Sequence, residues 1–200
     1  MAHLPLTLVY RQKFIQDQLA DSAETKKKIF EACAGDIIKA VDAVIRCYNT
    51  GGKVLLCGNG GSAADSQHIA AELVIRMTKP DRRALPAIAL TTDSSMLTAG
   101  SNDIGFENVF SRQVEGLARP GDVLIAISTS GKSENVKRAV AEAKKRGMTT
   151  IGFLGKGGGA SREMVDIPIV VPSDDTQRIQ EGHITIAHII CGIVENEMFG

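Results

Sequence analysis

From Lys53 onward, short apolar runs alternate with helical patterns along the chain. The runs are rich in Val, Ile, Leu and Ala, and they span residues 54–57, 87–90, 123–127, 150–154 and 167–171. Apolar residues recur at helical spacing over residues 62–77, roughly 94–118 with a break near Gly105, 133–146 and 176–199. This alternation predicts an α/β fold with a doubly wound, five-stranded parallel sheet flanked by helices. Pro168 cannot donate to a sheet ladder, so we expect the last strand at an edge.

The residues before Lys53 give no strand pattern. Leu4–Leu19 has a loose helical pattern that is broken near Asp21–Ser22, and Glu24–Tyr48 has a stronger amphipathic one that Gly51–Gly52 should end. Two helices ahead of the first strand cannot both pack on one sheet without leaving apolar surface. We therefore expect the first helix to pack against another subunit and to serve in oligomerisation.

The chain contains no internal repeat, low-complexity segment or long linker. We therefore expect one domain over residues 1–200, with an N-terminal helical segment (1–50) and an α/β core (51–200). Pro80–Pro86 is expected to be a surface loop within that core.

The charge balance, the lengths of the apolar runs and the cysteine spacing argue against several classes of protein. Basic and acidic residues number 23 each, which argues against a general nucleic-acid binder. No apolar run approaches the ~18 residues that span a bilayer, and no signal sequence is present, so no membrane association is expected. The cysteines form no C-x-x-C pair, which is typical of reduced thiols in a cytoplasmic protein. They are Cys33, Cys47, Cys57 and Cys191.

Ligands of parallel sheets bind in the turns beyond the carboxyl ends of the strands. These turns read GNGGS (58–62), TTDSS (91–95), STSGKS (128–133) and GKGGG (155–159). The third, which we call the serine loop, places four hydroxyls near a helix N-terminus, where backbone N–H groups and the helix dipole favour an anion. They belong to Ser128, Thr129, Ser130 and Ser133. Simple helix capping by Ser130 or Ser133 is the alternative, but four hydroxyls favour the anion site.

The glycine-rich turn after the first strand allows a ligand to approach the backbone. It does not match the dinucleotide fingerprint, which disfavours a nicotinamide dehydrogenase. Asn59 in this turn could hydrogen-bond a sugar hydroxyl, or it could simply tolerate a left-handed conformation.

Two predicted helices carry candidate metal ligands. His68 and Glu72 lie four residues apart and project from one helix face, although an ordinary solvated face is the alternative. His188 lies in an apolar run of the last helix, where a buried core histidine is the usual interpretation, and Gln180 precedes it by eight residues. These residues could form a four-ligand zinc site. Eight helical residues span about 12 Å, so either the helix is irregular near Gly182 or the two residues serve sites in different subunits.

Together these segments resemble the sugar isomerase (SIS) domain family, and most closely its phosphoheptose isomerases. The matching motifs are CGNGGSAADSQHIAAEL, LPAIALTTD, SNDIGFENVFSRQVEGLARPGDVLIAISTSGKSENV and RIQEGHITIAHIICGIVE. The resemblance covers nearly the whole chain. It implies an aldose–ketose isomerase that converts sedoheptulose 7-phosphate to D-glycero-D-manno-heptose 7-phosphate through an enediol. This reaction is the first step of ADP-heptose synthesis for bacterial lipopolysaccharide.

The resemblance also implies roles for particular residues. It implies that Glu72 and His188 act as base and acid, and that the protein is a homotetramer with active sites where subunits meet. It implies one Zn²⁺ per subunit, held by His68, Glu72, Gln180 and His188. The implied contacts to the sugar phosphate are Asn59, Gly60, Gly61, Ser62, Glu72, Asn102, Asp103, Ser128, Thr129, Ser130, Ser133 and Gln180.

Two alternatives within the same family remain. Some relatives are non-catalytic proteins that bind the replication initiator, and these do not keep the acid and base positions. Glu72 and His188 are both present here, which favours an enzyme. The other alternative is an isomerase of a different sugar phosphate, such as an amino-sugar phosphate.

Overall fold

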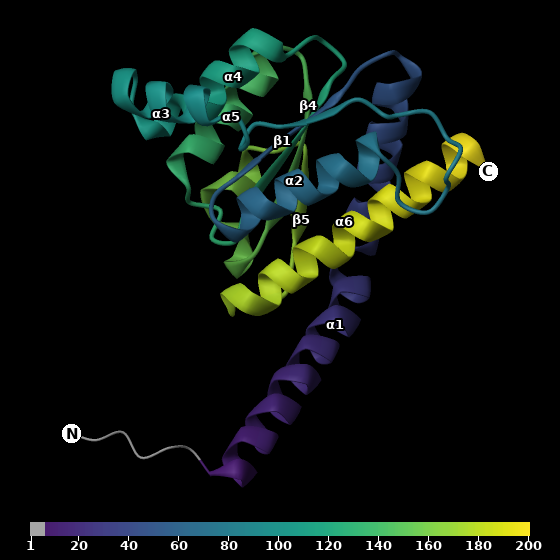
Figure 1. The fold of residues 1–200 in the computed structure, drawn as a ribbon, viewed down its shortest axis with the longest axis vertical. Coiled ribbons are helices and arrows are strands. Elements are labelled where there is room, and N and C mark those ends of the chain that lie inside the picture. The colour runs from purple at the N-terminus through teal and green to yellow at the C-terminus, as the bar shows by residue number, and fades with distance from the viewer. Residues whose placement is uncertain (1–6) are drawn as a thin grey trace.

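The computed structural model describes residues 7–200, and its centre is a five-stranded parallel sheet (Figure 1). The strand order is β2-β1-β3-β4-β5, which confirms the predicted sheet and places β5, with Pro168, at an edge. The strands are β1 (Val54–Gly58), β2 (Ala87–Ala89), β3 (Val123–Ser128), β4 (Thr149–Leu154) and β5 (Ile167–Val170).

Helices cover both faces of this sheet. Alternate strand residues point to opposite faces, so Leu56 joins the core beneath α1, α2 and α6, whereas Leu55 joins the core beneath α4 and α5. The α-helices are α1 (Leu8–Asn49), α2 (Gly61–Val74), α3 (Ser94–Asp103), α4 (Val109–Leu117), α5 (Glu134–Lys145) and α6 (Thr176–Phe199). The 3₁₀ segments are η1 (Phe106–Asn108) and η2 (Lys156–Glu163).

The N-terminal segment is one helix rather than two. α1 runs unbroken through Asp21–Ser22, so the predicted break there is wrong. Asp and Ser cost a helix only about half a kcal/mol each relative to Ala, and neither blocks the backbone as Pro would. The prediction for Leu4 lies outside the described residues. Gly51, with φ +77, follows the end of the helix as expected.

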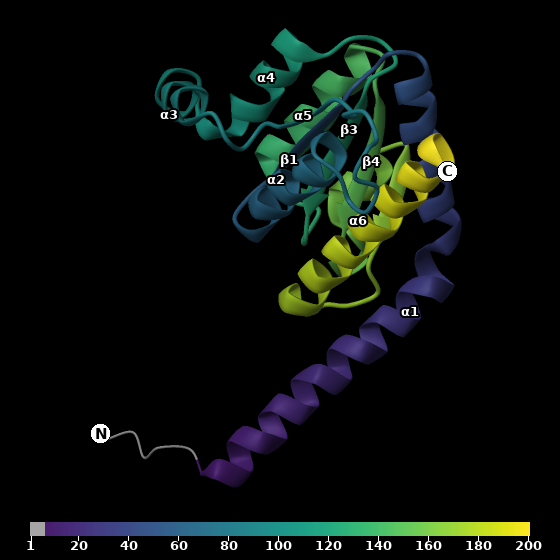
Figure 2. The same ribbon diagram turned by 45° about the vertical axis from the view of Figure 1, so that its right-hand side comes forward.

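The two halves of α1 have different surroundings. The buried positions begin at Thr25 and continue to Tyr48, against the sheet and α6. The first half extends away from the α/β body as a lone helix (Figures 1 and 2). Arg178 of α6 lies where the halves meet, and its Nη1 donates to the carbonyl of Gln18 at 2.5 Å.

The candidate site depends on the pair α2 and α6, which run side by side on one face of the sheet (Figures 1 and 2). α2 begins directly after β1, where Gly58 is required because a Cβ there would overlap Ser62. No helix in the described residues has both the length and the apolar character needed to cross a membrane.

Candidate active site

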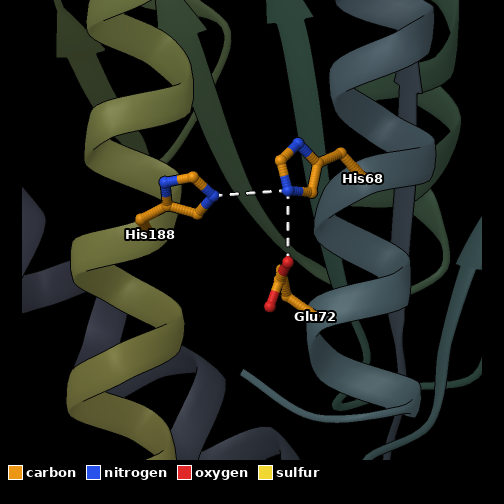
Figure 3. A group of neighbouring side chains, drawn as sticks. All are labelled: His68, Glu72 and His188. Carbon is orange, nitrogen blue, oxygen red and sulfur yellow. Dashed lines mark hydrogen bonds and ion pairs between the residues drawn. The ribbon is translucent and has the colours of Figure 1, made fainter. Parts of the chain in front are cut away.

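α2 and α6 bring together two imidazole rings and one carboxylate (Figure 3). His68 Nε2 lies 3.1 Å from Glu72 Oε1 and 3.3 Å from His188 Nε2. The rings of His68 and His188 meet edge to face. His68 is exposed and the other two residues are half-buried, so a ligand can reach the cluster from solvent. The structure thus unites three of the four residues that the sequence singled out as ligands.

Local sequence explains how α2 presents its two polar side chains. Ile69 and Leu73 follow His68 and Glu72 by one residue each and are buried in the core. Burial of these apolar residues turns the preceding positions towards α6 and solvent. The helical spacing of four then places the imidazole and the carboxylate side by side.

The three side chains fit a divalent metal ion. Two imidazoles and a carboxylate are a donor set that zinc binds, and their donor atoms lie within 4.8 Å of one another. Tetrahedral zinc with bonds of about 2.1 Å holds its ligand atoms about 3.4 Å apart. The separations of 3.1 and 3.3 Å are close to this value. The donor chemistry and the spacing therefore both suit one ion between the helices.

Gln180 lies elsewhere on the helix pair. α6 continues without interruption through Gly182, so the alternative of an irregular helix is wrong. A Cβ on Gly61 would overlap the Gln180 amide, which places this side chain over the first residue of α2. Gly61 is about 10 Å along the helix axis from His68. The alternative that ligands come from different subunits stays a prediction.

The two histidines near the middle of α6 have different environments. His183 is fully buried and its Nε2 lies 3.0 Å from the carbonyl oxygen of Leu154. Burial lowers the pKa of His183 to about 4, so this ring is neutral near pH 7. His188 is half-buried and faces another imidazole. The core histidine of this helix is therefore His183, not His188.

Asp65 is another acidic residue of α2 and lies about one turn before His68. Its Oδ2 atom is buried and has no hydrogen-bond partner among the described residues. Burial raises the pKa of Asp65, and the charge of His68 opposes that effect. The carboxyl thus lies within electrostatic reach of the cluster.

The hydroxyls of the serine loop are not used as helix caps. Ser133 occupies the N-cap position of α5, but its side chain makes no capping bond and lies 3.3 Å from Ser128 Oγ. Ser128 Oγ accepts from the N–H of Gly131, and Ser130 Oγ accepts from the N–H of Lys132. The capping interpretation is therefore not supported for Ser133. Hydroxyls and a helix N-terminus at the ligand end of the sheet suit an anion.

The GKGGG turn after β4 (155–159), together with Ser161 just beyond it, packs against the serine loop. Gly131 has φ +61, and a Cβ there would overlap the carbonyl of Gly158. Ser161, which is buried, donates from both its N–H and its hydroxyl to the carbonyl of Gly131. The GKGGG turn therefore shapes the serine loop by packing against it.

The turn after β1 is joined to the start of α5 by a reciprocal amide pair. The Nδ2 of Asn59 donates to Asn135 Oδ1 at 2.9 Å, and Asn135 Nδ2 donates back to Asn59 Oδ1 at the same distance. Gly60 has φ +57 and precedes α2, whereas Ser62 is only 3% exposed. Sequence reasoning did not single out Asn135. The available signal was an amide directly behind the serine loop.

Asn102 and Asp103 are the last two residues of α3, a helix at the periphery of the molecule (Figure 1). Their side chains hydrogen-bond to each other at 2.7 Å. Over residues 7–200, no hydrogen bond joins either residue to the serine loop or to the His68 cluster. Within one subunit, these two predicted substrate contacts are therefore not hydrogen-bonded to the other residues of the site.

Comparison with known proteins gives consistent matches over most of the chain. A family model described as the SIS domain matches residues 18–155. The chain is similar to the phosphoheptose isomerase of Clostridium acetobutylicum, with 55% identity over 191 residues that cover 94% of this chain and 97% of that protein. Its similarity to the phosphoheptose isomerase of Nitratiruptor sp. is 57% identity, over 90% and 96% of the two chains.

Solved structures give the same result. A phosphoheptose isomerase structure from Francisella tularensis matches with a TM-score of 0.89 and 39% identity, covering 93% of this chain and 98% of that one. The structure from Neisseria gonorrhoeae matches with a TM-score of 0.87 and 42% identity, over 92% and 98%. The arrangement of strands and helices described above is therefore shared with both.

Proposed function

Because the chain belongs to the phosphoheptose isomerases of the SIS domain family, we propose that it converts D-sedoheptulose 7-phosphate to D-glycero-D-manno-heptose 7-phosphate. The chain is thus an aldose–ketose isomerase that supplies the first step of ADP-heptose synthesis. The observation that carries this function is the meeting of Glu72 with two imidazoles between α2 and α6. Their presence favours the enzyme over a non-catalytic relative.

The proposed reaction moves a proton between C1 and C2 of the sugar through an enediol. Glu72 removes the proton from one carbon and returns it to the other, because a carboxylate can act as a general base and then as an acid. His188 donates a proton to the carbonyl oxygen as the enediol forms and recovers it as the product carbonyl forms. The half-buried position of both groups supports this assignment, since each can contact substrate from solvent.

One Zn²⁺ per subunit is the proposed cofactor, with His68, Glu72, His188 and Gln180 as ligands. A bound zinc would supply a Lewis acid for negative charge on the sugar oxygens. Ligation lowers the basicity of a carboxylate and occupies an imidazole nitrogen, so Glu72 and His188 would carry protons in a state in which they do not ligate the ion. The donor set and its spacing support the first three ligands. Within one subunit the Gln180 side chain lies over Gly61, away from the three other ligands. We therefore propose that Gln180 of a neighbouring subunit completes the set.

The proposed phosphate anchor is the serine loop, through Ser128, Thr129, Ser130 and Ser133. Hydroxyls that make no helix-capping bond, together with the N-terminus of α5, support this assignment. The remaining proposed contacts to the sugar come from the turn after β1 and from the end of α3. They are Asn59, Gly60, Gly61, Ser62, Asn102 and Asp103.

The proposed working form is a homotetramer of single-domain subunits in the cytoplasm, with active sites where subunits meet. Exposed apolar side chains on the free half of α1 support association of this kind, since a monomer would leave them in water. Gln180 and the paired Asn102 and Asp103 lie away from the His68 cluster, which also suits sites completed by a second subunit.

A direct assay tests the function. Incubation with sedoheptulose 7-phosphate should yield the aldose product, and the absence of product would reject the proposal. Glu72→Gln should reduce turnover by at least about 10²-fold, as loss of a general base does, and should leave the assembly intact. Activity near the wild-type level would reject Glu72 as the base. Elemental analysis should find one zinc per chain.

A further inference from the structure

A buried ion pair lies two helical turns beyond His188 along α6. Arg82 Nε donates to Glu195 Oε1 at 2.6 Å, and only 2% of each side chain is exposed. Arg82 belongs to Pro80–Pro86, which the sequence predicted as a surface loop between α2 and β2. The loop is at the surface, but this side chain points into the molecule.

Glu195 binds the start of the same connection. Its Oε1 also accepts from the N–H of Met77, and its Oε2 accepts from the N–H and hydroxyl of Thr78 and from the N–H of Lys79. Burial would raise the pKa of Glu195, but these donors and Arg82 outweigh it and hold the pKa well below the usual range. The Glu195 carboxylate therefore stays charged, and both of its oxygens accept hydrogen bonds.

Arg82 also holds the end of α2. Its Nη2 donates to the backbone carbonyl of Glu72 at 2.6 Å, and its Nη1 donates to the carbonyl of Arg83. The last carbonyls of a helix have no partner within the helix, and a cation is favoured there. Arg82 thus satisfies one of these carbonyls, and it is the carbonyl of the proposed catalytic base.

The two contacts of Arg82 join the helices that form the active site. His188 and Glu195 are seven residues apart and so lie on the same face of α6. That face meets α2, which carries His68 and Glu72. A single guanidinium therefore connects the backbone of Glu72 with the helix that presents His188.

We propose that Arg82 and Glu195 are positioning residues for the isomerisation, which fix the separation of α2 and α6 and thereby the placement of Glu72 against His188. Neither side chain contacts the reacting atoms. The inference rests on the proposed roles of Glu72 and His188. A displacement of about 1 Å from a change remote from the chemistry can cost on the order of 100-fold in rate.

Arg82→Lys tests the bridge while keeping the charge beside Glu195. A single ammonium cannot reproduce the planar fork that reaches both Glu195 and the Glu72 carbonyl. We expect kcat to fall by about tenfold or more, with KM within about twofold because the serine loop is untouched. Glu195→Gln should have the same effect. Arg83→Lys is the matched control, since Arg83 lies over the Phe199 ring in the same loop without contacting Glu72, and its kcat should be unchanged.

Ring NMR signals from ¹⁵N-labelled histidine separate positioning from general support. In Arg82→Lys, the signals of His68 and His188 should shift, while those of His183, buried in the same helix, should stay in place. Shifts of all three rings with a large fall in Tm would assign the pair a merely structural role and overturn the inference. Unmoved rings, or wild-type kcat in both variants, would also overturn it.

The NMR result stands by itself if the wild type proves inactive on sedoheptulose 7-phosphate. In that case the proposed function fails, and the ring signals still show whether Arg82 places His68 against His188. If Glu195→Gln does not fold, Arg82→Lys decides the question, because it preserves the ion pair.

Discussion

Gly61 is the point where the absence of a side chain matters most for the proposed site. A Cβ there would overlap the amide of Gln180, which lies at the flexible end of its side chain and can move. Gly61→Ala should therefore displace Gln180 with little loss of stability, because alanine also favours the helix by up to about 1 kcal/mol. We expect kcat/KM to fall by about tenfold or more, with Tm equal to or above that of the wild type.

Gly35→Ala provides the control for this substitution. Gly35 is an exposed helical residue of α1, and a Cβ there would meet no atom within 4 Å. The Gly35→Ala variant should have a higher Tm than the wild type and an unchanged kcat/KM. Equal activity in the two alanine variants would show that the position of Gln180 over Gly61 is not needed for the reaction.

His183 gives the protein a predictable response to acid. Its pKa is about 4 in the fold, below the ordinary value of 6.5, so the unfolded chain binds the proton more readily between these values. Stability is therefore complete above pH 6.5 and falls as the pH drops towards 4, by at most about 3 kcal/mol from this residue. His183→Gln should flatten the pH dependence of the free energy of unfolding, measured with urea. Parallel curves for wild type and variant would contradict this.

Sequence reasoning found the residues of the site whose relation is local. His68 and Glu72 are recognisable because four residues make one helical turn. Asn135 bonds a residue 76 positions away, and Glu195 bonds one 113 positions away. Arg82 also lies in a proline-flanked loop, where an arginine is ordinarily solvated. Such partners are set by how elements pack, so no pattern along the chain indicated them.

The strands and the helices that follow them could be predicted because each buries one side on the sheet. Val54 and Leu56 point to one core, and Leu55 and Cys57 to the other, so β1 appears as a continuous apolar run. The free half of α1 buries almost nothing, and its pattern was correspondingly loose. The false break at Asp21–Ser22 came from weak helix formers in a segment where packing gives little signal.

The reciprocal amide bonds of Asn59 and Asn135 connect two ligand-binding elements, the turn after β1 and the N-terminus of α5. Asn135→Ala would leave the partly buried amide of Asn59 without its partner, which costs about 1–3 kcal/mol. The turn and the serine loop would then lose their fixed relation. We expect a lower free energy of unfolding and a higher KM for the sugar phosphate, measured by urea titration and steady-state kinetics.

A double-mutant cycle checks that the two asparagines act together. Asn59→Ala combined with Asn135→Ala should cost little more than either change alone, because the second change removes a group already unpaired. Additive losses would mean that each amide has an independent partner. In that case Asn59 would be better explained as a direct contact to substrate.

One face of the sheet carries both the proposed chemistry and the long helix. α1 packs against α6 through its second half, and Arg178 of α6 holds the carbonyl of Gln18 where the free half begins. α6 in turn presents Gln180 and His188. Any second copy that covers the free half of α1 would therefore lie near the end of α6 that carries Gln180, which links assembly to completion of the site.

The exposed apolar side chains of α1 allow this assembly to be tested without truncation. Ile15 and Leu19 are 59% and 67% exposed and lie one turn apart on the same helix face. Ile15→Lys with Leu19→Lys would place two charges in the proposed interface, so we expect a smaller particle by light scattering and a loss of isomerase activity. Gln12→Lys with Gln16→Lys adds the same charge at exposed polar positions and should change neither. If the particle mass of the Ile15→Lys, Leu19→Lys variant were unchanged, α1 would not be part of the interface. If the variant dissociated and kept full activity, the complete active site would lie within one subunit.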